Sequence, residues 1–265
     1  MQGLMDSMYD YEYFKGQVLK LTKIDLNAYK EKQMKRRIDT LISRHHLDGY
    51  QAFLDRIQED SDVMEEFVNY LTINVSEFYR NPDQWEILDK EVFQSLFERF
   101  GQRLTIWSAA CSTGDEPYSL VMALSRYMPL SRIKIIATDI DKQVLLAAKN
   151  GIYPAKSLEN VPKDLKDKFF VEEGSLYRIS DEVKRCVEFR EHNLLRDTYP
   201  SNVNLIVCRN VLIYFTEEAK DEIFKKFYNS LSHGGILFLG STEQMIGYKE
   251  VGYQRRASFF FEKPV

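Results

Sequence analysis

The stretch LTIWSAACSTGDEPYS, residues 104–119, decides the fold class of this chain. It begins with a short apolar run, and small residues then lead to Pro117, where the first turn of a helix would lie. Three further apolar runs, at 133–138, 203–208 and 236–239, follow at intervals filled by helical patterns. Short buried strands separated by helices are typical of a parallel sheet with crossover helices. The sequence therefore predicts a doubly wound α/β domain.

The chain before this stretch has a helical pattern. Residues 11–79 contain no proline and little glycine, and their apolar residues recur at helical spacing. Asn81 and Pro82 are typical of a cap and first turn that open a further helix. We therefore expect an all-helical domain at 1–80 and the α/β domain at 81–265.

The α/β domain carries an additional segment between its second and third strands. Apolar runs at 169–171, 176–179 and 187–189 surround turn residues, which indicates short antiparallel strands. We expect a small antiparallel β-subdomain inserted at about 166–193. The tail, at 258–261, is expected to form a late strand at the edge of the main sheet.

Composition limits the classes of partner. The 265 residues are 44% hydrophobic and 29% charged, as in folded globular proteins, and the net charge is −4. Without an overall positive field, non-specific nucleic-acid binding is not expected, so electrostatic recognition must be local. No apolar stretch reaches the roughly 20 residues that a membrane span needs, and residues 1–13 lack a signal-peptide pattern. We expect a cytoplasmic monomer that does not insert into membranes.

Cysteine and histidine patterns argue against two other kinds of site. The three cysteines are odd in number and widely spaced, and the four histidines show no metal-ligand spacing. Neither a disulfide framework nor a metal site is expected.

Charge is unevenly distributed in the helical segment. Residues 15–46 carry nine basic and three acidic residues, whereas residues 48–66 carry one basic and seven acidic residues. Two solvated helix faces that offset one another would explain this split. A basic surface for an acidic partner is the alternative explanation.

The loop after the first strand has the wrong chemistry for a phosphate. Gly114 is its only glycine, so neither a G-x-G-x-x-G turn nor a Walker loop is present. Asp115 and Glu116 would repel a phosphate but suit a cation or an amino group. Alternatively, these two carboxylates only complement the dipole of the following helix.

The second strand ends in a carboxylate pair at Asp139 and Asp141. An acid at this place in α/β folds holds a ribose through its hydroxyls. A ribose without a pyrophosphate indicates a nucleoside, and a nucleoside with a cationic, amino-acid-like arm is S-adenosylmethionine. The alternative is that this Asp-x-Asp pair merely caps the next helix.

The third strand ends in CRNVLIYF, residues 208–215. Its position places Arg209 and Asn210 at the ligand crevice beyond the sheet. Tyr214 is a candidate for lining the sulfonium, which the face of an aromatic ring attracts. It could instead be a core aromatic residue.

Together these motifs resemble the CheR-type chemotaxis receptor methyltransferases over nearly the whole chain. The resemblance rests on ACSTGDEPYS at 110–119, NVSEFYR at 74–80, TDID at 138–141, HNLL at 192–195 and CRNVLIYF at 208–215. It implies a class I, Rossmann-like methyltransferase domain that follows the helical domain in the sequence. The implied activity is transfer of a methyl group from S-adenosylmethionine to glutamate side chains of chemotaxis receptors, giving glutamate methyl esters and S-adenosylhomocysteine.

The resemblance also implies roles for individual residues. Tyr214 matches the tyrosine beside the transferred methyl group. The implied cofactor-binding residues are Asn74, Ser76, Arg80, Glu116, Asp139, Asn193, Leu194, Arg209 and Asn210. Asp115 departs from the pattern, because the family commonly has a glutamate there, so Glu116 is the safer assignment.

This chemistry needs few catalytic groups. A glutamate side chain has a pKa near 4.3, so the acceptor is already an ionised nucleophile at neutral pH and needs no general base. The basic segment then has a use: Lys32, Lys35, Arg36 and Arg37 would bind the acidic methylation helices on the cytoplasmic domains of membrane chemotaxis receptors.

Other functions remain open at this point. The chain could be a signalling module that binds S-adenosylmethionine without turnover, or a methyltransferase for another acceptor. A nicotinamide-dependent oxidoreductase is disfavoured because the required glycines are missing.

Overall fold

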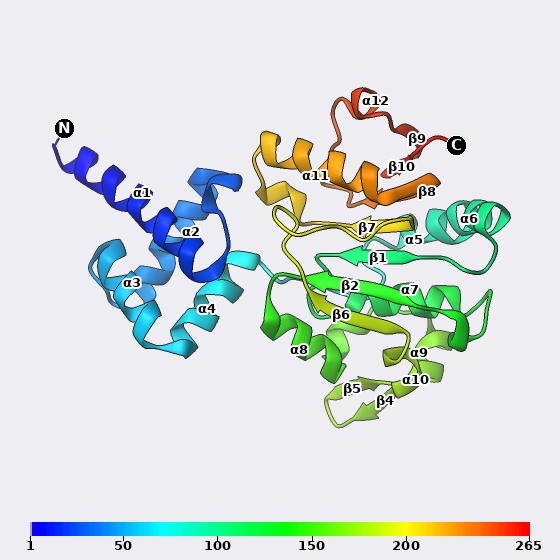
Figure 1. The fold of residues 1–265 in the computed structure, drawn as a ribbon. Coiled ribbons are helices and arrows are strands. Elements are labelled where there is room, and N and C mark those ends of the chain that lie inside the picture. Colours follow the sequence, from blue (N-terminus) through cyan, green and yellow to red (C-terminus); the bar gives the residue numbers. More distant parts are fainter. Residues whose placement is uncertain (1) are drawn as a thin grey trace. The chain divides into compact units, whose positions relative to one another are not determined.

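The computed structural model describes residues 2–265, with side chains from residue 10 onward (Figure 1). Met1, the start of the expected helical domain, lies outside the described residues. By packing, the chain divides into two units. The helical unit comprises the chain up to Asn74 together with Tyr214–Lys220, and the sheet unit comprises Val75–Ile213 and Asp221–Val265. The boundary expected after residue 80 stays a prediction.

The helical unit is built around clustered aromatic side chains. Phe53 lies between two other buried rings, with centroid distances of 6.3 Å to Phe14 and 5.4 Å to Phe67. The Asp60 side chain caps the fourth helix by accepting two backbone N–H groups. The elements are α1 Gln2–Thr22, the 3₁₀ turn η1 Leu26–Ala28, α2 Glu31–Arg44, α3 Gly49–Glu59 and α4 Ser61–Thr72.

A segment from late in the sequence packs against η1 in this unit. Tyr29 and Phe215 form an isolated antiparallel bridge, and their rings stack with centroids 4.7 Å apart. The N–H of Thr216 donates to the carbonyl of Ala28 at 2.8 Å. This pairing fixes Tyr214 beside the start of α2.

The sheet unit contains a seven-stranded sheet in the order β6-β2-β1-β7-β8-β10-β9. The first five strands in this order are parallel, and β10 runs antiparallel to both of its neighbours, β8 and β9. Their bounds are β1 Ile106–Ala109, β2 Ile135–Asp139, β6 Val187–Glu191, β7 Val203–Cys208, β8 Leu231–Leu239, β9 Gln254–Ala257 and β10 Phe260–Glu262. The predicted α/β fold with a helical N-terminal domain is confirmed.

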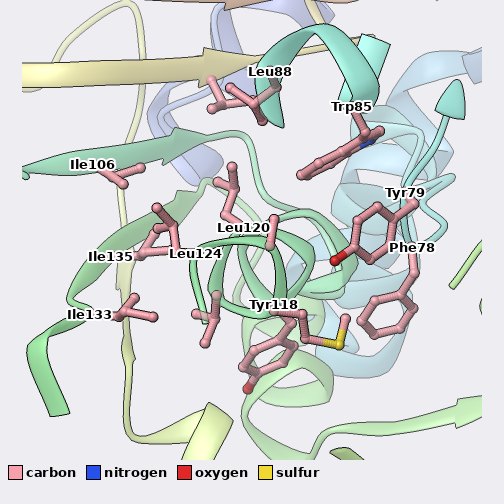
Figure 2. Packing of buried hydrophobic residues seen from close by; sticks show 14 of the residues in the cluster. Phe78, Tyr79, Trp85, Leu88, Ile106, Tyr118, Leu120, Leu124, Ile133 and Ile135 are labelled. Atoms are coloured by element: carbon pink, nitrogen blue, oxygen red, sulfur yellow. The ribbon is translucent and has the colours of Figure 1, made fainter. Parts of the chain in front are cut away.

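Helices pack on both faces of this sheet. Ile106 of β1 and Ile135 of β2 belong to one buried cluster with Leu120 and Leu88, which lie in helical segments (Figure 2). On the opposite face the ring of Trp107 packs on Phe227. The helices and short helical turns are α5 Pro82–Ile87, a π turn η2 Leu88–Val92, α6 Phe93–Phe100, α7 Asp115–Leu124, η3 Leu130–Arg132, α8 Lys142–Asn150, η4 Ala155–Leu158, α9 Lys163–Phe169, α10 Asp181–Lys184, η5 Leu212–Tyr214, α11 Glu217–Ser230 and α12 Tyr248–Val251.

A separate antiparallel sheet has the order β3-β5-β4, with β3 Ile152–Pro154, β4 Phe170–Glu173 and β5 Leu176–Ile179. The β-subdomain is therefore present, but one strand assignment within the expected range was wrong. The run at 187–189 lies in β6 of the main sheet, because Val187 and Phe189 pack on the apolar cluster under α8. Its place in the small sheet is taken by β3, which precedes the expected range.

The expected edge position of the tail strand was also wrong. The strand is β10, and it lies between β8 and β9. Phe260 and Phe261 are buried, whereas β9 carries the exposed Arg255 and Arg256 and forms the edge. Among the described residues, no helix is long and apolar enough to span a bilayer.

Candidate functional site

The carboxyl ends of β2, β1 and β7 lie next to one another in the sheet, and strained loops follow two of them. After β1, Ala110 and Ser112 adopt φ values of 63° and 48°, and after β7, Asn210 adopts 61°. Non-glycine residues in this left-handed region are costly and cluster at functional sites. The loops after β1 and β7 are therefore the first candidates for a ligand site.

The loop after β1 turns at Gly114 and presents a buried carboxylate. Gly114 has φ 88°, and a Cβ there would lie 2.9 Å from the Cβ of Ala148, so only glycine fits. Asp115 is 1% exposed and accepts a 2.6 Å hydrogen bond from the Thr113 hydroxyl. Burial raises the pKa of Asp115, although the hydroxyls of Thr113 and Ser76 oppose this shift.

Glu116 lies at the start of α7 between a hydroxyl and a guanidinium. It accepts a 2.8 Å hydrogen bond from Ser108 of β1, and its second oxygen is 3.6 Å from Arg209. Burial raises the pKa of Glu116, and the charge of Arg209 partly offsets this. The carboxylate is thus oriented by the protein while its side chain remains 13% exposed.

Asp139 ends β2 and holds the neighbouring loop. One carboxylate oxygen accepts the N–H of Ser112 at 2.8 Å, and the other accepts the N–H of Asp141 at 3.1 Å. Burial raises its pKa to about 6. Asp141, not Asp139, caps α8, because its side chain accepts the N–H of Gln143 at 2.8 Å. Helix capping therefore explains only the second acid of this pair.

Arg209 is buried and hydrogen-bonded to the segment that leads into α5. Its guanidinium donates to the carbonyl of Arg80 at 2.6 Å, to Asn81 at 3.1 Å and to Gln84 at 2.9 Å. It also lies 4.8 Å from the ring centroid of Phe238. With these partners Arg209 orients Glu116 and the turn that opens α5.

The loop containing Asn210 is held by a residue that the sequence interpretation did not select. Glu243 accepts four backbone N–H groups, including that of Asn210 at 2.9 Å. A usable signal was present, because Glu243 lies in the polar stretch directly after the apolar run at 236–239. The rule that selected Asp139, an acid following a buried strand, would also have selected this residue.

The remaining predicted cofactor residues lie in the segment between α4 and α5 and in the loop after β6. The Asn193 side chain accepts the N–H of Leu195 at 2.9 Å, and the carbonyl of the buried Leu194 accepts the Tyr199 hydroxyl at 2.7 Å. Arg80 donates to the carbonyl of Val75 at 3.1 Å. Ser76 and Arg80 belong to the sheet unit, whereas Asn74 belongs to the helical unit and donates to the Thr72 hydroxyl at 2.8 Å.

The helical unit has a basic pocket of its own, with a volume of about 520 Å³. The N–H of Lys30 donates to the carbonyl of Tyr214 at 2.9 Å, which joins Tyr214 to the start of α2. The pocket is lined by Lys30, Lys32, Gln33, Met34, Arg36, Arg37, Ile73 and Tyr214. It therefore combines the predicted catalytic tyrosine with three of the four predicted substrate-binding cations.

The predicted substrate-binding cations differ in their surroundings. Lys35 does not line the pocket, and its ammonium lies 5.2 Å from the centroid of the Tyr11 ring. Arg37 donates to the backbone carbonyl of Tyr70, and its guanidinium lies 4.4 Å from the centroid of the Tyr70 ring. Lys32 and Arg36 are exposed. These two side chains are the ones best placed to meet a partner.

The loops at the strand ends fit a cationic nucleoside. Buried polar atoms of the β1 loop, Ser112 Oγ and Asp115 Oδ1, have no hydrogen-bond partner within the described part of the chain. Carboxylates at Glu116 and Asp139 supply acceptors for an amino group and for ribose hydroxyls. Among the described residues, no group of three or more His, Cys, Asp or Glu side chains could hold a metal ion.

A mixed α/β sheet with acidic and polar loops at its strand ends is the class that the structure shows, and comparison with known families makes the class specific. Residues 74–259 match the family described as CheR methyltransferase, SAM binding domain. Residues 9–72 match CheR methyltransferase, all-alpha domain. The chain belongs to the CheR methyltransferase family, and the resemblance drawn from its motifs is confirmed.

Curated relatives agree along the full chain. A chemotaxis protein methyltransferase of Listeria monocytogenes is 40% identical over 254 residues, which cover 96% of this chain and 97% of the relative. The Listeria innocua protein of the same name is 39% identical with the same coverage. Chemotaxis protein methyltransferase 1 of Pseudomonas aeruginosa is 33% identical over 89% of this chain and 90% of its own length. The chain is thus similar to chemotaxis methyltransferases with an S-adenosylmethionine-binding domain.

Proposed function

We propose that this protein methylates glutamate side chains on the cytoplasmic domains of membrane chemotaxis receptors, using S-adenosylmethionine and forming methyl esters and S-adenosylhomocysteine. The observation that carries this proposal is the basic pocket, in which Tyr214 lies among Lys32, Arg36 and Arg37. Such a pocket attracts an anionic acceptor. The names of the curated relatives, chemotaxis protein methyltransferase, support the same assignment.

The cofactor would be held mainly by acids of the sheet unit. Glu116 suits the amino group of its methionine arm, and Asp139 suits its ribose hydroxyls. The family resemblance adds Asn74, Ser76, Arg80, Asn193, Leu194, Arg209 and Asn210. When bound, S-adenosylmethionine supplies a methyl group on a positively charged sulfur. Arg209 would act by orienting Glu116, since Nη1 lies 3.6 Å from that carboxylate and Nη2 is held by Arg80, Asn81 and Gln84.

The acceptor requires positioning more than activation. A glutamate carboxylate is ionised at neutral pH, so no side chain has to remove a proton. Lys32 and Arg36 would draw the carboxylate in, and the ring of Tyr214 would lie beside the cationic sulfur. Positioning of reactants can supply about 7 kcal/mol or more of the barrier reduction.

The proposal is tested by labelling. Purified protein is incubated with methyl-labelled S-adenosylmethionine and receptor-bearing membranes, and the receptor band is then treated with alkali. We expect label that alkali releases as methanol, and no label on a receptor whose methylatable glutamates are replaced by glutamine. Alkali-stable label would indicate methylation of nitrogen, and absence of label in protein that binds the cofactor would indicate a binding module. Either result would overturn the proposal.

A further inference from the structure

Glu243 is a buried carboxylate whose two oxygens are saturated by backbone donors. It follows β8 and is 5% exposed. One oxygen accepts the N–H groups of Gly240 at 2.7 Å and Asn210 at 2.9 Å. The other accepts those of Val211 at 2.9 Å and Leu212 at 2.7 Å. Burial raises the pKa of Glu243, and the four backbone N–H groups oppose this shift.

The carboxylate links two adjacent loops. Asn210 to Leu212 follow β7, and Gly240 follows β8, its parallel neighbour. Asn210 is held in the left-handed region, with φ 61°, which costs free energy that the surrounding contacts must offset. Without Glu243, three consecutive N–H groups of the β7 loop would lose their acceptor. The carboxylate therefore fixes the conformation of the loop.

The packing around this contact is tight. A Cβ built on Gly240 would lie 2.8 Å from the Glu243 carboxylate and 2.9 Å from the nitrogen of Asn210. Even one methyl group would therefore push the carboxylate and the loop apart. Glu243 also acts at longer range, because its charge raises the pKa of Glu116 and stabilises the charged form of Arg209.

We propose that Glu243 is a positioning residue for the cofactor: it holds the backbone of Asn210 to Leu212 in the conformation that binds S-adenosylmethionine, without contacting the cofactor itself. This inference rests on the proposed function for the identity of the ligand. A carboxylate suits this role because each of its two oxygens accepts one pair of N–H groups. An amide of the same size cannot replace it, because its NH₂ group would face two donors.

The direct test is the affinity for S-adenosylhomocysteine, measured by calorimetry on the full chain without receptor. We expect Glu243→Gln to raise the Kd about tenfold or more, since one pair of N–H groups loses its acceptor. Gly240→Ala should also raise the Kd, although it changes no charge. This variant provides the test if Glu243→Gln folds poorly. The apparent KM for receptor should stay within about twofold in both variants.

The matched control is Glu262→Gln. Glu262 is also a buried glutamate of the sheet unit, 8% exposed, but its partners are Arg99 at 2.6 Å and Arg256 at 3.4 Å. This substitution should lower the melting temperature and leave the Kd unchanged. If Glu243→Gln and Gly240→Ala behave like Glu262→Gln, Glu243 is only structural and the inference is wrong.

A double-mutant cycle separates positioning from general destabilisation. Because Glu243→Gln and Gly240→Ala are both proposed to act by displacing the same loop, the double variant should raise the Kd by clearly less than the product of the two single effects. Additive effects would overturn the inference. Failure of the unmodified protein to bind S-adenosylhomocysteine would instead overturn the proposed function, so the two outcomes are distinguishable.

Discussion

Asp139 couples cofactor binding to pH. Its pKa is raised from 3.8 to about 6 by burial, so between about pH 4 and 6 the folded protein holds a proton that the unfolded chain releases. The free energy of unfolding should therefore fall as pH rises through this window. Asp139→Asn should remove that part of the pH dependence, worth about 2 to 3 kcal/mol, as urea unfolding across this pH range would show.

The same carboxyl group should release its proton when the cofactor binds. Ribose hydroxyls donate hydrogen bonds to the ionised form, so binding favours loss of the proton. Calorimetry near pH 5.5, roughly the middle of the window, in two buffers of different ionisation enthalpy should show proton release, reduced in Asp139→Asn. Equal release by both proteins would mean that another group, such as Asp115 or Glu116, is responsible.

Tyr214 is expected to act through its ring and not through its hydroxyl. Tyr214→Phe keeps the aromatic face and should retain activity within about threefold, whereas Tyr214→Ala should lower kcat about tenfold, the value of a partly desolvated cation–π contact. Initial rates of receptor methylation at saturating cofactor would measure both. A Phe variant as impaired as the Ala variant would show that the hydroxyl is required.

Single residues differed in how far the sequence could predict their surroundings. Asp139 and Glu116 could be predicted from the sequence. Asp139 directly follows an apolar run, and Glu116 follows another after a short loop, so both were expected at the strand ends that face the ligand crevice. The contacts of Arg209 were not predictable, because its partners at 80–84 lie about 125 residues earlier in the chain. For Glu243, the four converging N–H groups exist only once β7 and β8 are paired.

At the scale of elements, α2 offers a matched pair of lysines. Lys32 lines the basic pocket, whereas Lys35 lies one turn on and contacts the ring of Tyr11. Lys32→Glu should raise the apparent KM for receptor about five- to tenfold at low salt, and Lys35→Glu less than about twofold. The two variants carry the same net charge, so equal effects would indicate a general field of the helix and not a pocket.

The turn between β1 and α7 should tolerate no side chain at Gly114. In Gly114→Ala, both the φ of 88° and the 2.9 Å approach to Ala148 oppose the new methyl group, and we expect a loss of about 2 to 3 kcal/mol in the free energy of unfolding. Gly174→Ala is the control, since Gly174 has φ 66° but no atom within 4 Å of a new Cβ. It should cost about 1 kcal/mol. Equal losses in urea unfolding would show that steric contact is unimportant.

Elements were predictable where burial on both faces made the pattern unambiguous. The run at 203–208 coincides with β7, all of whose residues are buried. The strand β3 was missed and the run in β6 was assigned to the wrong sheet, because both strands are short and partly exposed and their sequence does not specify which neighbour they pair with. Partner choice was decided by tertiary contacts, such as those of Phe189 with the cluster under α8.

At the scale of the whole molecule, the local distribution of charge is more informative than the net charge. The chain has a net charge of −4, yet its helical unit contains a pocket lined by four basic side chains and no acidic one among the described residues. In the sheet unit, the loops at the strand ends carry buried carboxylates at Asp115 and Asp139 and a partly buried one at Glu116. Opposite local charges suit the two reactants, an anionic acceptor and a cationic donor, in a protein whose overall charge is modest.

Under the proposed function, this arrangement would favour product release. Esterification would replace a negative charge on the receptor with a neutral group, so the basic pocket should hold the product less tightly than the substrate. A receptor fragment with one methylatable glutamate replaced by glutamine, which is also neutral, should bind about three- to fivefold more weakly at low salt, as measured by fluorescence anisotropy. The difference should nearly vanish at about 1 M salt, where the Debye length is about 3 Å. Replacement of an acid outside the methylation helices is the control, and equal affinities at low salt for the glutamate and glutamine fragments would show that charge at the acceptor does not govern release.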